Sequence, residues 1–164
     1  MEVAGQVAVV TGGASGIGRA LCKTLAAERA TGVVVADLDL ERAEAVAAEV
    51  GGLAVQADVT VEQEVQSLVQ RAIAVFGRID LYCSNAGVAF GGGPEAPDHA
   101  WQQSFQVHVL AHVYAARAVL PGMLRQGAGY FLGTISAAGL LNHVGAAPYA
   151  ATKAAGLSFL EWMT

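Results

Sequence analysis

Short apolar runs alternate with helix-like segments along this chain, and that alternation constrains the possible folds more than any other feature. The predicted strands cover 6–11, 33–36, 53–57, 79–83 and 130–136. The predicted helices cover 16–29, 41–50, 61–76, about 98–125, and a last segment that begins near Pro148. Strands that alternate with helices favour a parallel sheet covered on both faces. Right-handed crossovers then predict an α/β fold with a doubly wound parallel sheet, built as one domain over 1–164.

The segments between these elements carry simpler expectations. Residues 87–97, which include three consecutive glycines, and residues 137–147 are predicted to be loops. Pro121 lies inside the long helical segment, so we expect it to kink that helix or to end its regular part.

Composition and charge exclude several classes of protein. Hydrophobic residues make up 54% and charged residues 14%, which excludes intrinsic disorder. The net charge is −5 without any basic cluster, so the footprint of a nucleic-acid binder is missing. No apolar run is long enough to span a membrane, and residues 1–5 do not resemble a signal peptide, so we expect a cytoplasmic protein. Cys22 and Cys83 are isolated and expected to be reduced, and no metal-ligand spacing is present.

A glycine-rich turn follows the first predicted strand and opens the first predicted helix. Its glycines are Gly12, Gly13, Gly16 and Gly18 within Thr-Gly-Gly-Ala-Ser-Gly-Ile-Gly, residues 11–18. Free backbone N–H groups at a helix N-terminus attract phosphate, and a Cβ at these positions would block its close approach. The strand–turn–helix context therefore predicts a site for the pyrophosphate of a dinucleotide, with an ordinary glycine-rich turn as the alternative.

Acidic residues end the next two predicted strands. Asp37 follows Gly18 by nineteen residues, the spacing typical of a carboxylate that binds the adenosine ribose hydroxyls. A carboxylate repels a 2′-phosphate, and neither Ser15 nor Leu38 is basic, so we expect NAD rather than NADP. Asp58 could accept a hydrogen bond from the adenine amino group. Alternatively, each aspartate only caps the helix that follows it.

Tyr149 and Lys153 are four residues apart in the last predicted helix and therefore share a face. A phenol is a poor base near neutral pH, but a nearby ammonium and a positive nicotinamide ring both stabilise its negative form. Tyr149 could then exchange a proton with a hydroxyl or carbonyl group, and Ser136 could hydrogen-bond the same oxygen. Lys153 could also donate to the nicotinamide ribose. The alternative is an ordinary pair without a catalytic role, because tyrosine and lysine at this spacing are common on helices.

These motifs make the sequence similar to the short-chain dehydrogenase/reductase family, whose marks cover the whole chain in the family's order. The marks are residues 11–18, Asp58-Val59, Asn85-Ala86-Gly87, Leu120-Pro121, Ser136, and Tyr149 with Lys153. The resemblance implies a Rossmann-like fold and NAD-dependent hydride transfer between a nicotinamide and an alcohol or ketone. It implies catalytic roles for Ser136, Tyr149 and Lys153, and a homodimer or homotetramer. The implied cofactor-binding residues are Gly12, Ser15, Gly16, Ile17, Gly18, Asp37, Asp58, Val59, Asn85, Ala86, Gly87, Tyr149 and Lys153. Asn85 is also expected to tie the central strands together.

The sequence departs from the family pattern in two places. The family usually has an asparagine that supports a proton relay where this chain has His108, which could carry that role or be a tolerated helix residue. The chain also stops at Thr164, inside its last predicted helix, so we expect it to lack the family's last strands and its substrate-covering segment. The predicted fifth strand would then be an open, apolar edge. A truncated, non-catalytic dinucleotide-binding protein or fragment is therefore the alternative function.

Overall fold

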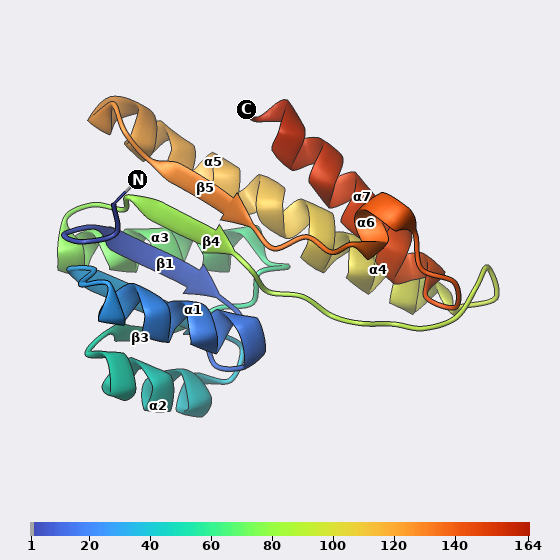
Figure 1. Cartoon of the computed structure of the whole chain (residues 1–164), viewed down its shortest axis with the longest axis horizontal. Coiled ribbons are helices and arrows are strands. Elements are labelled where there is room, and N and C mark those ends of the chain that lie inside the picture. Colours follow the sequence, from blue (N-terminus) through green and yellow to red (C-terminus); the bar gives the residue numbers. More distant parts are fainter. Residues whose placement is uncertain (1) are drawn as a thin grey trace.

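The computed structural model, which describes residues 2–164, has a five-stranded, entirely parallel sheet at its centre (Figure 1). The strands are β1 (Val7–Thr11), β2 (Gly32–Asp37), β3 (Leu53–Gln56), β4 (Leu81–Ser84) and β5 (Tyr130–Gly133). Their order across the sheet is β3-β2-β1-β4-β5. The chain thus builds outward from β1 in one direction and then in the other. This doubly wound order confirms the predicted α/β class and places a crevice at the carboxyl ends of β1 and β4.

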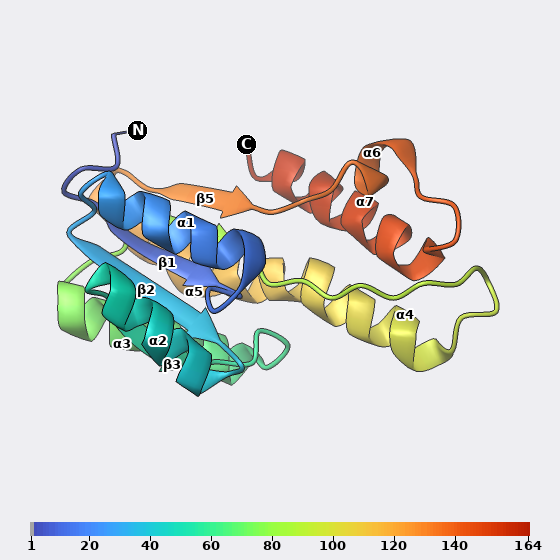
Figure 2. The same cartoon turned by 60° about the horizontal axis from the view of Figure 1, so that its bottom comes forward.

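Helices cover both faces of this sheet. The helical elements are α1 (Gly16–Ala27), α2 (Leu40–Val50), α3 (Glu62–Phe76), α4 (Asp98–Phe105), the π-helical turn η1 (Gln106–Leu110), α5 (Ala111–Gln126), α6 (Ala138–Leu141) and α7 (Ala147–Trp162). Helices α1 and α2 lie on one face, and α3 and α5 lie on the other (Figure 2). Helix α7 packs against α4 and η1 rather than over the centre of the sheet.

The core is divided by β1 itself, which is buried along its whole length. Val9 packs with the side chains of α3 and α5, whereas Ala8 and Val10 pack with those of α1 and α2. This alternation follows from the two-residue period of a strand, which points successive side chains to opposite faces. A strand buried on both faces needs a continuous apolar run, as this one has.

The long helical segment differs from the sequence prediction. The irregular part lies at η1, where the Ala111 N–H donates to the Gln106 carbonyl five residues earlier. Pro121 does not end the regular part, since α5 continues to Gln126, so that alternative was wrong. The extra residue of a π turn redirects the side chains around it, and such turns are frequent at functional sites.

The region after α5 also differs from the sequence prediction. Strand β5 ends at Gly133 rather than at residue 136, and the short helix α6 occupies part of the predicted 137–147 loop. Strand β5 pairs only with β4 and forms one edge of the sheet, where Tyr130 and Leu132 are 53% and 41% exposed. The predicted open edge is therefore present in the described residues.

One helical segment is long and apolar enough to cross a membrane by length and composition. It runs from Asp98 to Gln126 with a mean hydropathy of 1.3 in its best window, and half of that window is buried inside the fold. Polar residues interrupt this segment, so it contains no uninterrupted apolar run of that length. Burial of this degree is typical of a core helix, and α5 does supply Ala115, Val119 and Met123 to the core.

Candidate active site

A cavity of about 740 Å³ lies at the carboxyl ends of the strands, within the size range of small-molecule sites. Its walls come from the turn after β1, the ends of β2 and β3, the turn after β4, and helices α4, η1 and α7. Every residue that the sequence assigned to the cofactor lines it: Gly12, Ser15, Gly16, Ile17, Gly18, Asp37, Asp58, Val59, Asn85, Ala86, Gly87, Tyr149 and Lys153. Ser136 and His108 are not among its lining residues.

The glycine-rich turn leaves the N-terminus of α1 open toward this cavity. Gly12 and Gly16 have φ values of +65° and +49°, which favour glycine, and a Cβ on Gly16 would point into empty space. The N-cap Ser15 makes no side-chain capping bond, and the first turn of α1 has no acidic residue. The free N–H groups and the positive end of the helix dipole are therefore left for an external anion.

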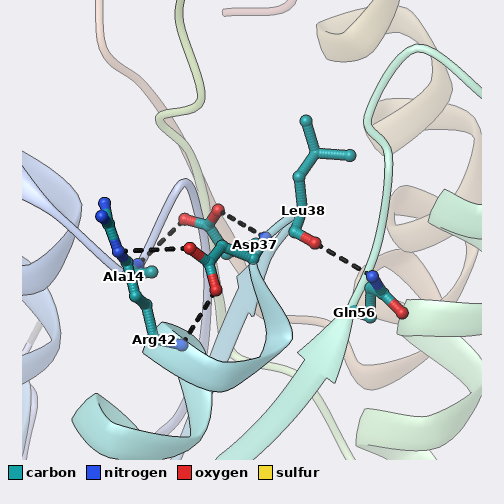
Figure 3. Close-up of polar contacts among 6 residues, drawn as sticks. Ala14, Asp37, Leu38, Arg42 and Gln56 are labelled. Carbon is teal, nitrogen blue, oxygen red and sulfur yellow. Dashed lines mark hydrogen bonds and ion pairs between the residues drawn. The ribbon is translucent and has the colours of Figure 1, made fainter.

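Asp37 supports the glycine-rich turn from the end of β2. Its Oδ2 accepts a hydrogen bond from the Ala14 N–H at 3.0 Å, and its Oδ1 accepts one from the Asp39 N–H at 3.2 Å (Figure 3). The N-cap of α2 is Asp39, whose carboxylate accepts from the Arg42 N–H. The alternative that Asp37 only caps the following helix is therefore wrong.

Asp58 has a local structural role in addition to its place in the cavity wall. Its Oδ1 accepts from both the N–H and the hydroxyl of Thr60, at 2.8 and 2.7 Å. Its own N–H donates to Glu64 Oε2 at 2.7 Å, near the start of α3. Asp58 thus fixes the turn between β3 and α3, although Val61, rather than Asp58, is the N-cap residue.

Asn85 ties three strands together at their carboxyl ends. Its Nδ2 donates to the Thr11 carbonyl at 2.9 Å, and its backbone N–H donates to Thr11 Oγ1 at 3.0 Å. Its Oδ1 accepts from the Thr134 hydroxyl at 2.9 Å. These contacts occupy both the oxygen and the nitrogen of the side-chain amide. Of the two roles expected for Asn85, they therefore favour holding the strands together over binding the cofactor.

Tyr149 and Lys153 lie one turn apart on α7 and face the cavity together. Lys153 Nζ is 5.8 Å from the centroid of the Tyr149 ring and donates to the Thr134 carbonyl at 2.8 Å. The lysine is only 4% exposed, and burial lowers its pKa from the ordinary value. The Tyr149 ring is only half-buried, so a ligand can still reach its phenol. Lys153 thus places a positive charge beside an accessible phenol.

Ser136 follows the end of β5 and precedes α6. Its hydroxyl accepts a hydrogen bond from the Ala138 N–H at 3.2 Å, and its carbonyl accepts from the Gly139 N–H. The side chain therefore stabilises the start of α6 in this structure. A serine hydroxyl keeps its own proton free for a second bond while it accepts in this way.

His108 lies on η1, behind the cavity wall, and is completely buried. Its Nε2 accepts from the Val88 N–H at 3.2 Å, and its Nδ1 lies 2.9 Å from Thr152 Oγ1. Its ring stands edge-on to the Tyr149 ring, with centroids 5.3 Å apart. Both ring nitrogens have protein partners, which favours the alternative without a proton-relay role.

Comparison with known proteins assigns the family. The model of the short chain dehydrogenase family matches residues 6–164. The chain belongs to this family. Among its relatives, 1-deoxy-11-beta-hydroxypentalenate dehydrogenase of Streptomyces exfoliatus is 39% identical over 96% of this chain and 60% of that protein. The 7alpha-hydroxysteroid dehydrogenase of Escherichia coli K12 is 32% identical over 94% of this chain and 62% of that protein.

A solved short-chain dehydrogenase/reductase from Burkholderia phymatum, determined in complex with NAD, superposes with a TM-score of 0.93. The two chains are 35% identical, and the match covers 99% of this chain and 60% of the Burkholderia phymatum chain. The chain thus spans about 60% of the length of the short-chain dehydrogenases that it matches.

Several residues that shape this cavity could not be identified from the sequence. Thr134 receives the Lys153 bond and donates to Asn85, and Thr152 joins His108 to α7. Gln103 and Gln106 line the cavity from α4 and η1. The threonines lie within four residues of motif positions, which is a weak signal. The glutamines gave no signal, because neither belongs to a motif in the sequence.

Two buried histidines should make the folded protein sensitive to mild acid. Burial and the charge of Lys153 lower the pKa of both His108 and His112 to about 4, against 6.5 in the unfolded chain. Between these values the unfolded chain binds protons that the folded chain does not, so stability is complete above about pH 6.5 and falls as the pH falls toward 4. We expect the free energy of unfolding to drop by roughly 1.4 kcal/mol per pH unit for each histidine.

Urea unfolding between about pH 7 and pH 5 measures this loss, in a range where ordinary carboxylates stay ionised. His112→Leu is expected to remove about half of the slope. The matched control is His143→Asn, since His143 is exposed in the loop after α6 whereas His112 is buried. Equal stability at both pH values would contradict the prediction.

Proposed function

We propose that the protein is an NAD-dependent oxidoreductase that transfers hydride between the nicotinamide and an alcohol or ketone. The observation that carries the proposal is one continuous cavity. It has the open α1 N-terminus and Asp37 in one part of its wall and the Tyr149–Lys153 pair in another. A pyrophosphate site and an acid–base pair within one cavity suit a dinucleotide that reacts with a small hydroxyl or carbonyl compound.

The chain's own groups fit this cofactor. The N–H groups at the start of α1 would hold the pyrophosphate, and Asp37 would accept from the adenosine ribose hydroxyls while keeping its bond from Ala14. When bound, the cofactor supplies the hydride acceptor or donor. Asp37 would also repel a 2′-phosphate, and neither Ser15 nor Leu38 supplies a basic partner for one, which supports NAD over NADP.

The proton moves separately from the hydride, and Tyr149 would carry it. In alcohol oxidation the Tyr149 phenolate accepts the hydroxyl proton, and in ketone reduction the phenol donates it back. The ammonium of Lys153 stabilises the negative form, and its bond to the Thr134 carbonyl holds it beneath the ring. Ser136 would donate its free hydroxyl proton to the same substrate oxygen while its own oxygen accepts from Ala138.

A direct test measures hydride transfer by the purified protein. NADH fluorescence titrations would give the affinity, and absorbance of NADH would report turnover with a panel of secondary alcohols and the matching ketones. We expect NADH to bind at least about tenfold more tightly than NADPH because of the carboxylate of Asp37. NADH binding without turnover of any compound would favour the non-catalytic alternative, and absence of NADH binding would overturn both.

A further inference from the structure

His108 joins two segments that are far apart in the sequence and that both border the cavity. The Val88 N–H in the turn after β4 donates to one side of its ring, and Thr152 on α7 lies against the other. Val88 follows Gly87, and a Cβ on Gly87 would lie 3.8 Å from both His108 Nε2 and Lys153 Nζ. The imidazole thus bridges the β4 turn and the helix that carries Tyr149 and Lys153.

The donors and acceptors in this bridge have one consistent direction. A backbone N–H can only donate, so Nε2 must be unprotonated to accept from Val88. In a neutral imidazole the proton then lies on Nδ1, which donates to Thr152 Oγ1. The Thr152 hydroxyl donates in turn to the Pro148 carbonyl at 2.7 Å. The chain of bonds therefore ends on the first turn of α7, one residue before Tyr149.

A second connection holds the same two segments a few residues further on. The Gly92 N–H donates to the Gly145 carbonyl at 2.7 Å, and the Ala147 N–H donates to the Gly92 carbonyl at 2.8 Å. Ala147 is the first residue of α7. The loop after β4 is therefore bonded to α7 at two places, from Val88 through His108 to Thr152 and from Gly92 to Ala147. Tyr149 lies between these two places in α7.

We propose that His108 is a positioning residue whose imidazole, through Val88 and Thr152, fixes Tyr149 relative to the β4 turn of the cofactor cavity. The proposal rests on the proposed function for its catalytic consequence but not for the bridge itself. The π turn supports it, because η1 carries His108 at a buried place where both nitrogens meet protein partners. The edge-on contact between the two rings adds a direct steric restraint on Tyr149.

The catalytic test removes the bridge from the side of Thr152. Thr152→Val leaves the Nδ1–H without an acceptor, whereas Thr152→Ser keeps the hydroxyl and is the matched control. For hydride transfer we expect Thr152→Val and His108→Leu to lower kcat by about 10- to 100-fold, with Thr152→Ser close to wild type. Because no proton passes through His108, the solvent deuterium isotope effect on kcat should not change. Full activity of Thr152→Val, or an altered isotope effect with normal kcat, would overturn the proposal.

A second measurement does not depend on turnover. Nitrogen-15 NMR of the wild-type protein should show His108 protonated at Nδ1 and bare at Nε2, and hydrogen exchange should show a protected Val88 amide. In His108→Leu that amide should exchange at least about tenfold faster, with protection of the β1 amides unchanged. A proton on Nε2, or unchanged Val88 exchange, would overturn the bridge even in an active enzyme. A correct tautomer in a protein without turnover would instead locate the failure in the proposed function.

Discussion

Tyr149→Phe is expected to lower kcat for hydride transfer by about 10²–10⁴-fold, the usual contribution of a general acid or base. The substitution removes one oxygen and keeps the ring, so the edge-on contact with His108 survives. Lys153 keeps its bond to the Thr134 carbonyl, and the glycine-rich turn is untouched. The affinity for NADH should therefore change by less than about threefold, which separates loss of the proton carrier from loss of the cofactor site.

The matched control for this experiment is Tyr130→Phe. Tyr130 lies on the edge strand β5, is 53% exposed and does not line the cavity, so its hydroxyl should be dispensable. Steady-state kinetics and NADH titrations on both variants make the comparison. A Tyr149→Phe protein with more than about a tenth of wild-type kcat would show that another group carries the proton.

The part of the site that sequence alone predicted depends on short-range geometry. A glycine-rich turn between an apolar strand and a helix can adopt few backbone paths, so the placement of Gly12, Gly16 and Gly18 followed from residue types and spacing. Asp37 and Asp58 both line the cavity because parallel strands bring their carboxyl ends to one edge of the sheet, a placement that the strand order alone predicts. Tyr149 and Lys153 share a face because four residues make about one helical turn.

The parts that sequence missed depend on contacts between distant segments. A π turn is built from the same kinds of residue as a regular helix. The sequence of residues 98–126 therefore gave no sign that distinguishes η1 from regular helix. The partners of His108 come from Val88 and Thr152, which are 20 and 44 residues away in the chain. Ser136 was predicted to end a strand, but β5 stops at Gly133, and the serine instead stabilises the start of α6. Strand β5 is at the edge of the sheet and is held by β4 alone. Its paired part is therefore shorter than the apolar pattern of residues 130–136 predicted.

Gly18→Ala is expected to destabilise the protein by about 3 kcal/mol or more, at or above the usual range for overpacking. Gly18 lies in the first turn of α1, where its φ is ordinary and alanine would be the better helix former. A Cβ there would overlap the carbonyl oxygen of Gly12 and approach Asn85 Nδ2 to 2.7 Å. Backbone must move to relieve the first overlap, because a carbonyl has no rotamer to change.

The movement should reach the cofactor site as well as the free energy of unfolding. Asn85 holds Thr11 and Thr134, so displacing its amide disturbs the carboxyl ends of β1 and β5 together. We therefore expect NADH affinity to fall by at least about tenfold in whatever fraction of Gly18→Ala remains folded. Urea unfolding and NADH titration measure the two effects separately.

Gly122→Ala is the matched control, because Gly122 also lies in a helix and a Cβ there meets nothing within 4 Å. Alanine should stabilise α5 by roughly 0.5–1 kcal/mol, the difference in helix propensity, and leave NADH binding unchanged. Opposite signs for the same substitution in two helices would show that Gly18 is required for the close approach of α1 to the β1 turn, rather than for flexibility. Equal, small effects at both positions would contradict that packing argument.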